Sequence, residues 1–475
     1  MPAIIWFRQD LRLADNPALS FALEGGDAVI PVYIHAPAEE SPWEPGGAAR
    51  WWLHHSLGRL REQLKARGSD LLLRCAADSG AELLSLARET GATRIAWNRR
   101  YEPAAMTRDA RIKMQLRGAG LQCESFNGAL LREPWEVKTK TGTSYQVFTP
   151  FWRQLLSLPE PEAPLPAPAS LPPPPRWPRT EALDALRLLP RLRWDTGIAD
   201  VWEPGSDAGH GLLARFLDQR IGDYDRARDR PDMPGTSRMS PYLHAGNLSP
   251  REIWHAVRKR HGRREGWRES RFLAEVIWRE FAHHLLYHFP ETPDKPLRGN
   301  FARFAWAQDG AALRAWQRGL TGYPIVDAGM RQLWQTGWMH NRVRMITASF
   351  LVKDLLLSWQ QGSRWFWDTL VDADLASNTL GWQWSAGCGA DAAPYFRIFN
   401  PISQGRKFDP DGAYVRRFVP ELAQLPIDWI HEPWNAPADV LARAQVELGR
   451  HYPRPIVDHK VARVRALATL AALKS

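Results

Sequence analysis

Ten of the twenty residues from 159 to 178 are proline, and this stretch constrains the fold more than any other feature of the chain. Proline lacks a backbone amide donor and fixes φ, so the stretch can form neither a helix nor a central strand. We therefore expect a linker over residues 131–205, with short elements such as a helix over 148–156. A chain of 475 residues then divides into an N-terminal domain over 1–130 and a C-terminal domain over 206–475.

Short β-rich runs alternate with helical patterns before residue 130. Strands are predicted over 3–7, 28–34, 71–74, 94–97 and 122–126, and helices over 17–23, 48–67, 81–89 and 104–116. This alternation predicts a parallel sheet flanked by helices on both faces. No G-x-G-x-x-G follows the first strand, which runs into residues 8–12, and no Walker lysine loop is present. A nicotinamide-binding domain is therefore disfavoured.

Helical patterns dominate the C-terminal part, and no fixed repeat period is visible. The predicted helices cover 212–220, 250–260, 268–289, 311–320, 326–336, 342–359, 363–370 and 456–473. The fold class is thus an α/β N-terminal domain joined by a long linker to a large all-α domain. About 270 residues is large for one helical core, and a buried cofactor would help to organise it.

The formal net charge is +10, and residues 206–475 carry nine of these charges. A polyanion would dock on that part of the chain, although general solubility accounts for the charge equally well. No run approaches the ~20 apolar residues of a membrane span, and the N-terminus does not have the pattern of a signal peptide. Three cysteines lie far apart without a CxxC pair, which disfavours a disulfide framework or a zinc finger and indicates a reducing, cytoplasmic location.

Tryptophan is unusually frequent, with 24 residues, eleven of them between 267 and 384. Because an indole N–H needs a partner, tryptophan is a costly way to fill a core. This density suggests stacking on flat ligands, or a redox role.

Two predicted helices each have a mixed face, on which aromatic side chains lie beside charged or polar ones. Glu275 projects with Trp278 and Arg279 at i, i+3 and i+4, which could equally be a surface ion pair beside one packed tryptophan. Trp338, Asn341, Arg342 and Met345 share a second face. Their ring, amide, guanidinium and thioether suit an aromatic, partly polar ligand, although core helices often show such a stripe.

Three further segments could carry chemistry. Asp372 and Asp374 lack His or Cys at metal-ligand spacing, and pairing with Arg344 would bury the charge at lower cost. The hydroxyl-rich loop 235–241 could hold a phosphate or simply cap a helix. The basic run 258–264 is either a solvated loop or a phosphate contact.

Taken together and in order, these segments resemble the cryptochrome/photolyase flavoprotein family. The resemblance rests on residues 6–12, 236–238, 275–279, 338–342, 372–378 and 381–384, covers nearly the whole chain, and is closest to bacterial cyclobutane pyrimidine dimer photolyases. It implies an α/β antenna domain, a long connector and a helical FAD domain. It also implies light-driven repair of UV-damaged DNA, double or single stranded, with no membrane and no obligate protein partner.

The resemblance also assigns residues to roles. Positions implied to bind FAD are Tyr224, Thr236, Ser237, Arg238, Met239, Ser240, Phe272, Glu275, Arg279, Asn341, Arg344, Asp372, Asp374 and Asn378. Positions implied to bind DNA and the flipped lesion are Arg228, Glu275, Trp278, Asn341, Arg342, Met345 and Trp384. Trp382, Trp359 and Trp306 match an electron-transfer chain from the flavin to the surface. Glu275 and Asn378 are the implied catalytic residues, with no metal.

The implied chemistry is electron transfer from photoexcited, reduced anionic FAD to a dimer that has left the helical stack; photolyases are among the established base-flipping enzymes. Trp278 and Trp384 can supply stacking platforms, at ~1–3 kcal/mol per base. We expect Glu275 to hydrogen-bond a thymine carbonyl and to stabilise the dimer radical anion.

Alternatives remain within and outside the family. Six-four photolyases have histidines where this chain has Asn341 and Met345. Plant cryptochromes usually carry Asp, and animal ones Cys, at the position of Asn378. Repair is therefore favoured over a cryptochrome-type photoreceptor without repair activity. A basic nucleic-acid-binding module is the alternative outside the family.

A second, antenna chromophore is a family feature: methenyltetrahydrofolate, a deazaflavin or another flavin. Small apolar residues over 101–105 differ from some folate-binding relatives, whereas residues 47–53 look like those of relatives near plant cryptochromes. The resemblance favours methenyltetrahydrofolate and identifies no residues that bind it.

Overall fold

The computed structural model describes residues 1–262, 266–391 and 396–473. The chain forms two compact units. Unit 1 comprises Met1–Ile221, Ser237–Pro290 and Val371–Ala376, and unit 2 comprises Gly222–Thr236, Glu291–Leu370 and Ser377–Ser475. The domain boundaries expected near residues 130 and 205 stay a prediction.

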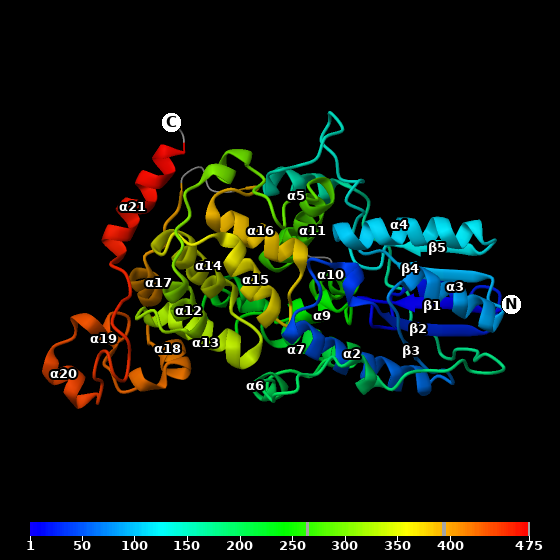
Figure 1. Ribbon diagram of the computed structural model, residues 1–475, viewed down its shortest axis with the longest axis horizontal. Coiled ribbons are helices and arrows are strands. Elements are labelled where there is room, and N and C mark those ends of the chain that lie inside the picture. The colour runs from blue at the N-terminus through cyan, green and yellow to red at the C-terminus, as the bar shows by residue number, and fades with distance from the viewer. Residues whose placement is uncertain (263–265, 392–395, 474–475) are drawn as a thin grey trace. The chain divides into compact units, whose positions relative to one another are not determined.

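Unit 1 contains a parallel sheet of five strands in the order β3-β2-β1-β4-β5 (Figure 1). The strands are β1 (Ala3–Phe7), β2 (Val29–His35), β3 (Leu72–Cys75), β4 (Arg94–Asn98) and β5 (Gln122–Phe126). In the register of β1, Ala3 lies opposite Val29 on one side and Arg94 on the other. All five strands lie within one residue of their predicted positions at either end, and the predicted fold class is confirmed.

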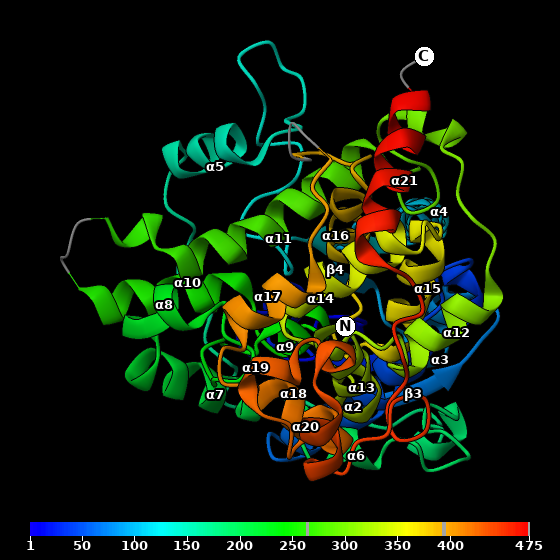
Figure 2. The same ribbon diagram turned by 90° about the vertical axis from the view of Figure 1, so that its left-hand side faces the viewer.

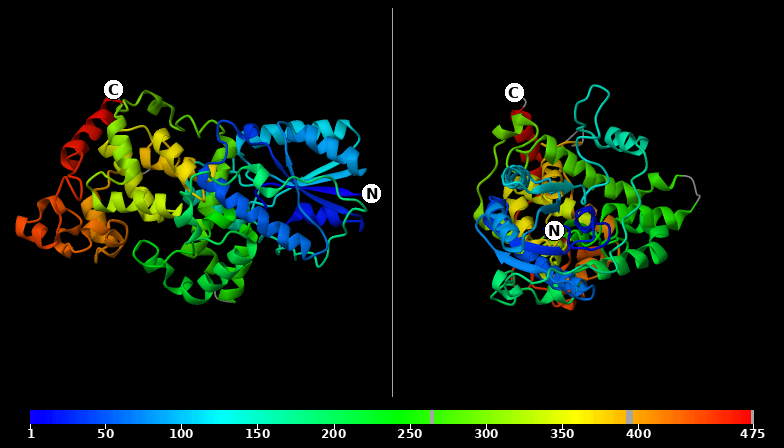
Figure 3. Two further views of the ribbon diagram at one scale, coloured as in Figure 1. Left: turned by 60° about the horizontal axis from the view of Figure 1, so that its bottom comes forward. Right: turned by 90° about the vertical axis from the view of Figure 1, so that its right-hand side faces the viewer.

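Helices cover both faces of this sheet, as the left panel of Figure 3 shows for the blue strands and the helices beside them. The helices are α1 (Pro17–Leu23), α2 (Gly47–Lys65), α3 (Ser79–Thr90) and α4 (Pro103–Gly118). Successive strand residues point to opposite faces. Ile5 and Phe7 accordingly pack with Leu60 of α2 in one core, while Ile4 and Trp6 share the other core with residues of α3 and α4.

The proline-rich stretch contains no helix or strand and is fastened to the sheet domain. The amide of Val29 donates to the carbonyl of Pro172 over 2.9 Å, and the amide of Glu181 donates to the carbonyl of Leu73 over 2.8 Å. Leu171 is buried in the core shared with α2. The proline-rich stretch and the residues after it therefore pack against the sheet of unit 1 and run beside β3 without adding a strand.

The remaining elements of unit 1 are helical. They are η1 (Pro37–Glu40), α5 (Phe148–Ser157), η2 (Leu183–Leu186), α6 (Thr196–Ala199), α7 (Ser206–Gln219), η3 (Ile221–Asp223, which continues into unit 2), α9 (Ser240–His244), α10 (Pro250–His261), η4 (Trp267–Glu269) and α11 (Arg271–His288).

Unit 2 is helical and is organised around α13, a nearly fully buried helix that packs against α12, α14, α17 and α18 (Figure 2). Its elements are α8 (Tyr224–Ala227), η5 (Gly299–Arg303), α12 (Gly310–Arg318), α13 (Pro324–Thr336), α14 (Asn341–Ser349), η6 (Phe350–Asp354), α15 (Trp359–Thr369), α16 (Leu375–Ala386, which begins in unit 1), α17 (Pro401–Phe408), α18 (Ala413–Phe418), η7 (Pro420–Leu422), α19 (Ile427–Ile430), η8 (Pro433–Asn435), α20 (Ala438–Arg443) and α21 (His459–Ala472). In the described part of the chain, no helix is both long and apolar enough to cross a bilayer.

The prediction of one helix over 342–359 is wrong. The α-helix ends at Ser349 and continues as one π-helical turn, Phe350–Asp354, in which the amide of Leu355 donates to the carbonyl of Phe350. Leu356 then adopts a left-handed backbone, with φ of 54°, and α15 begins with Ser358 as its N-cap. The run over 350–357, which is apolar apart from Lys353 and Asp354, has no proline or glycine to signal this break.

Candidate active site

The residues singled out from the sequence fall in both units. Unit 1 holds Ser237, Arg238, Met239, Ser240, Phe272, Glu275, Trp278, Arg279, Asp372 and Asp374. Unit 2 holds Tyr224, Arg228, Thr236, Trp306, Asn341, Arg342, Arg344, Met345, Trp359, Asn378, Trp382 and Trp384.

In unit 1, the hydroxyl-rich segment leads into α9. Arg238 adopts a left-handed backbone with φ of 56°, and its guanidinium lies 4.1 Å from the ring centroid of Trp202. Met239 is buried, and Ser240 begins the helix. This turn presents the hydroxyl groups and the first amides of α9 at one short segment, as a phosphate contact requires.

Helix α11 begins at the cap residue Ser270 and carries the first mixed face. Trp278 is half-buried and stacks on Phe148, with ring centroids 3.8 Å apart and an interplanar angle of 5°. Arg279 donates to the carbonyl of Ala129 over 2.7 Å. A buried Phe272 packs on Phe216. Arg279 therefore connects α11 to the segment that follows β5 through this hydrogen bond.

A carboxylate and a histidine form a pair beside that face. Nε2 of His283 lies 3.3 Å from the carboxylate of Asp374. Burial alone would raise the pKa of Asp374, but His283, Arg279 and His244 hold this pKa well below its usual range. Asp374 is therefore ionised at neutral pH. His283 was missed by sequence reasoning, although it continues the series 275, 279 by one more i+4 step.

His244 lies near Asp374 and near two further carboxylates, Glu102 and Asp372. Burial lowers the pKa of His244, against the opposing effect of Asp374, Glu102 and Asp372. Its Nδ1 atom is buried and has no hydrogen-bond partner in the described part of the chain. Buried polar atoms in native proteins are normally satisfied, so a polar ligand beside His244 would remove this deficit.

In unit 2, three residues of the second mixed face lie on α14, but Trp338 precedes this helix and is buried, so the prediction of one helical face with all four residues is wrong for Trp338. Asn341 is exposed, whereas Arg342 and Met345 are half-buried. Arg342 donates to Asp229 over 3.0 Å, and its guanidinium lies 4.5 Å from the ring centroid of Phe408. Arg344 donates to the carbonyl of Met339 over 2.8 Å.

Other predicted residues surround α14 in unit 2. Arg228 lies 3.9 Å from Asp229 and 5.5 Å from the ring centroid of Tyr224. His340 caps α14 by accepting from the amide of Arg342, and burial lowers the pKa of His340 to about 4. The imidazole is therefore neutral, and the arginines around it carry the positive charge.

Two cavities of unit 2 adjoin these residues. The larger, about 650 Å³, is lined by Arg342 and Asp229 together with Arg397, Lys407 and Arg463. The smaller, about 490 Å³, is lined by Trp384 and Lys353 and by several aromatic rings. Sequence reasoning missed Arg397, Lys407 and Arg463, which stand as isolated basic residues in the chain.

The predicted tryptophan chain also belongs to unit 2. Trp382 is buried against Phe366, with ring centroids 4.9 Å apart. A Cβ at Gly362 would lie 2.1 Å from the Trp382 ring, so the indole packs directly on the backbone of α15. Trp359 is buried, and Trp306 is half-buried.

Asn378 has a fixed orientation on α16. Its side-chain nitrogen donates to Ser363, over 2.9 Å to Oγ and 3.1 Å to the carbonyl. The amide oxygen consequently points away from Ser363 and is set to accept a hydrogen bond from another group.

Comparison with known proteins gives two family matches. Residues 3–170 match the family model described as DNA photolyase, and residues 272–472 match the FAD binding domain of DNA photolyase. A deoxyribodipyrimidine photo-lyase of Agrobacterium fabrum is 52% identical over 474 residues, covering 100% of this chain and 98% of the relative. Cryptochrome-1 of Arabidopsis thaliana is 42% identical, and the alignment covers 98% of this chain and 69% of the cryptochrome. The crystal structure of a class III photolyase from Agrobacterium tumefaciens has a TM-score of 0.96 at 52% identity, covering 100% of this chain and 98% of that one.

Proposed function

The chain belongs to the photolyase/cryptochrome family, and we propose that it is a light-driven enzyme that splits cyclobutane pyrimidine dimers in UV-damaged DNA. The observation that carries this proposal is the 52% identity, over the full chain, to a deoxyribodipyrimidine photo-lyase. The cation-lined cavity of unit 2 supports it, because four basic side chains around one hollow suit a phosphate backbone.

FAD is the cofactor of this proposal, and the residues present fit it. Reduced FAD, when bound and excited by light, supplies one electron to the dimer and recovers it after the ring bonds break. In unit 1, the unsatisfied nitrogen of His244 and the ionised Asp374 offer polar partners, and the segment of Ser237 and Ser240 offers hydroxyl groups. In unit 2, the amide oxygen of Asn378 would be available to accept a hydrogen bond from a reduced flavin.

The lesion is bound, in this proposal, by flat rings and by positive charge. Trp278 and Trp384 stack on the flipped bases, and Arg342 and Arg228 neutralise phosphates. Arg342 is already oriented by Asp229, so less side-chain entropy is lost when DNA binds. Trp382, Trp359 and Trp306 would relay electrons from an external reductant to an oxidised cofactor.

The proposal is tested by following thymine absorbance in dimer-containing oligothymidylate. Reduced protein under blue light should restore this absorbance, whereas samples kept in the dark should not change. Unchanged lesion content under light would overturn the proposal. A cryptochrome-type photoreceptor is the second candidate, which the 42% identity to Arabidopsis Cryptochrome-1 favours. It predicts a long-lived light state without turnover in the same assay.

Replacing Glu275 by alanine should lower the quantum yield of repair without removing the flavin. A half-buried carboxyl group on the face of Trp278 is placed to donate a hydrogen bond to a thymine carbonyl as negative charge develops there. Alanine removes this donor, whereas glutamine keeps one in its amide group, so we expect a larger loss in E275A than in E275Q. The matched control is E269A, since Glu269 is an exposed residue just before the same helix. An unaltered yield in E275A would remove the proposed role.

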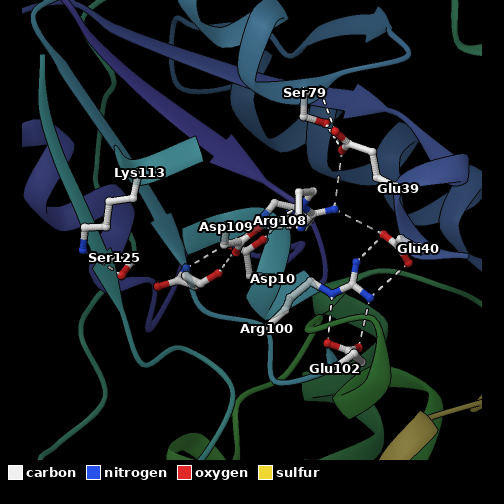
Figure 4. Close-up of polar contacts among 12 residues, drawn as sticks. Asp10, Glu39, Glu40, Ser79, Arg100, Glu102, Arg108, Asp109, Lys113 and Ser125 are labelled. Carbon is white, nitrogen blue, oxygen red and sulfur yellow. Dashed lines mark hydrogen bonds and ion pairs between the residues drawn. The ribbon is translucent and has the colours of Figure 1, made fainter. Parts of the chain in front are cut away.

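The antenna chromophore is a further part of the proposal, and the sheet leaves no room for it at the usual ligand position. Ligands of open α/β sheets bind at the carboxyl ends of the strands where the strand order reverses, here between β1 and β4. That position is filled by ion pairs: Arg100 lies between Glu40 and Glu102 (Figure 4), and Arg8 pairs with Asp109 at 2.9 Å. The hollow that remains is about 50 Å³. Cofactor pockets are about 300 Å³ or larger.

A groove beside α2 is large enough. It has a volume of about 460 Å³ and is lined by the rings of Trp51, His54, His55 and Trp202 and by Arg59. Burial lowers the pKa of His54 and of His55, so both rings are neutral at pH 7. Flat aromatic walls suit a pterin ring. Glu62 and Glu203 also line the groove and pair with Arg59 at 3.0 Å and 3.7 Å, so a carboxylate tail would have to share this guanidinium with them. We therefore place methenyltetrahydrofolate here, ahead of a deazaflavin or a second flavin.

Replacing Trp51 by alanine should remove the near-ultraviolet absorbance band of the folate from freshly purified protein. The ring contributes one wall of the groove, and its loss removes the stacking surface. W152A is the control, because Trp152 is a half-buried tryptophan of the same unit outside the groove. Equal folate content in W51A and W152A would contradict this placement.

A further inference from the structure

The π-helical turn Phe350–Asp354 contains a buried lysine whose partners belong to a distant segment of unit 2. The Lys353 side chain is almost fully buried, and its Nζ donates to the carbonyl of Arg397 over 2.5 Å. The same Nζ lies 4.2 Å from the ring centroid of Phe396. One turn earlier, Oγ of Ser349 accepts from the amide of Phe399 over 3.2 Å. Helix α14 and its π turn therefore hold residues 396–399 at three points.

The segment held in this way is a wall shared by the two cavities of unit 2. Phe396, Arg397 and Phe399 line both the cavity of about 650 Å³ that contains Arg342 and the cavity of about 490 Å³ that contains Trp384. Arg397 is exposed, whereas Lys353 is not. A shift of this segment would change both cavities at once.

The residue that follows the lysine holds a second shared wall. The carboxylate of Asp354 is 2.5 Å from Nδ1 of His459, and the carbonyl of Asp354 accepts from Arg465 over 2.6 Å. Both partners belong to α21, which contributes Arg463 and Leu467 to the two cavities. The π turn is thus the common anchor of two walls, and π-helical turns occur frequently at functional sites.

We propose that Lys353 is a positioning residue for lesion binding: its ammonium group holds residues 396–399 where Arg397 and the two phenylalanines meet the damaged strand. The inference rests on the proposed function, because the cavities are its lesion site. A methylene chain of the same length without charge would fill the space but could neither donate to the Arg397 carbonyl nor attract the Phe396 ring.

The charge of this group changes near neutral pH. Burial lowers the pKa of Lys353 to about 7, against the opposing effect of Asp354, while Arg397 lowers it further and Cys388 raises it. Arg298 and Arg463 line the same cavity, and His459 is paired with Asp354. The ammonium form, which makes the clamp, is therefore lost as the pH rises through about 7.

The pH dependence of the free energy of unfolding distinguishes a positioning role of Lys353 from a role in general stability. The unfolded chain keeps Lys353 protonated up to its ordinary pKa of about 10.4, so between the two values it binds more protons than the folded chain. The contribution of this lysine to the free energy of unfolding consequently rises with pH over that range. A fall in lesion affinity with rising pH cannot then be attributed to unfolding caused by Lys353.

The test measures the affinity of the FAD-containing protein for a dimer-containing duplex in the dark, from about pH 6 to about pH 9 at constant salt. Wild type should lose roughly tenfold in affinity across this range, since one charge-assisted hydrogen bond and its cation–π contact are lost. K353R should show a flat profile, because a guanidinium stays charged throughout. K353M should bind weakly at every pH, with flavin absorbance unchanged. A pH-independent wild type, or a K353M variant that binds dimers as tightly as wild type at about pH 6, would overturn the proposal.

A second measurement keeps the inference separate from the proposed function. Amide exchange at Phe399 should accelerate in K353M and in S349A relative to wild type, because both variants release the segment. Unchanged exchange in K353M would overturn the inference whatever the activity. If wild type does not distinguish damaged from undamaged duplex, the proposed function fails, and the exchange experiment still decides whether Lys353 holds the segment.

Discussion

Replacing Trp382 by phenylalanine is expected to abolish the light-driven reduction of oxidised flavin while repair by chemically prereduced protein continues. Trp382 is buried between Phe366 and Trp316, with ring centroids 4.9 Å and 6.1 Å away. Because solvent does not reach this position, no solvent molecule can take the place of Trp382 as an electron donor. A benzene ring is much harder to oxidise than an indole, and the substitution therefore removes a redox site while it keeps an aromatic ring in the cavity. Because Trp382 packs against the backbone at Gly362, the smaller ring relieves contacts and does not create a clash.

The measurement is the bleaching of the oxidised flavin band under blue light with an external reductant. W429F serves as the control, since Trp429 is a half-buried tryptophan of the same unit that is not assigned to the chain. It should photoreduce as wild type does. Loss of repair in prereduced W382F would show that Trp382 takes part in dimer splitting as well, and would contradict the separation of the two roles.

The sequence predicted those parts of the fold that depend on local patterns. Alternating strands and helices located all five strands, including β5, whose sequence is largely polar. The i+4 spacing of Glu275 and Arg279 placed them on one face of α11. The π turn at 350–354 was not predicted, and its contacts are tertiary: Lys353 and Asp354 reach Arg397 and His459, which are 44 and 105 residues away along the chain.

The binding residues also fall into a group that the sequence predicts and a group that it does not. Tryptophans and carboxylates were predicted because they cluster in short motifs. Arg397, Lys407 and Arg463 are isolated in the sequence, where they look like ordinary solvated side chains, and only the fold brings them around one cavity. The ion pairs at the sheet edge show the same limit. Arg8 and Arg100 lie beside strand ends where a ligand would be expected, and only the positions of Asp109, Glu40 and Glu102 reveal that the space is filled.

The second large effect is expected from Trp278→Ala, which should weaken binding of dimer-containing DNA by about 5- to 150-fold, the equivalent of ~1–3 kcal/mol for one stacked base. One face of the Trp278 ring is covered by Phe148 in a parallel stack at 3.8 Å, so the indole is held in a single orientation before any ligand arrives. A rigid platform loses little entropy on binding, which is why its removal is costly. Affinity is measured for damaged and undamaged duplexes of one sequence.

The comparison of duplexes decides what Trp278 does. Stacking on an extruded base exists only in the damaged complex, so W278A should leave the affinity for undamaged DNA nearly unchanged, whereas loss of a phosphate contact would weaken both. W152A removes another ring near Phe148, at 5.8 Å, and controls for disturbance of this aromatic cluster. F148A should fall between the two, because it leaves the platform but frees its orientation. Equal losses for both duplexes in W278A would mean that Trp278 supports the helix and is not a lesion platform.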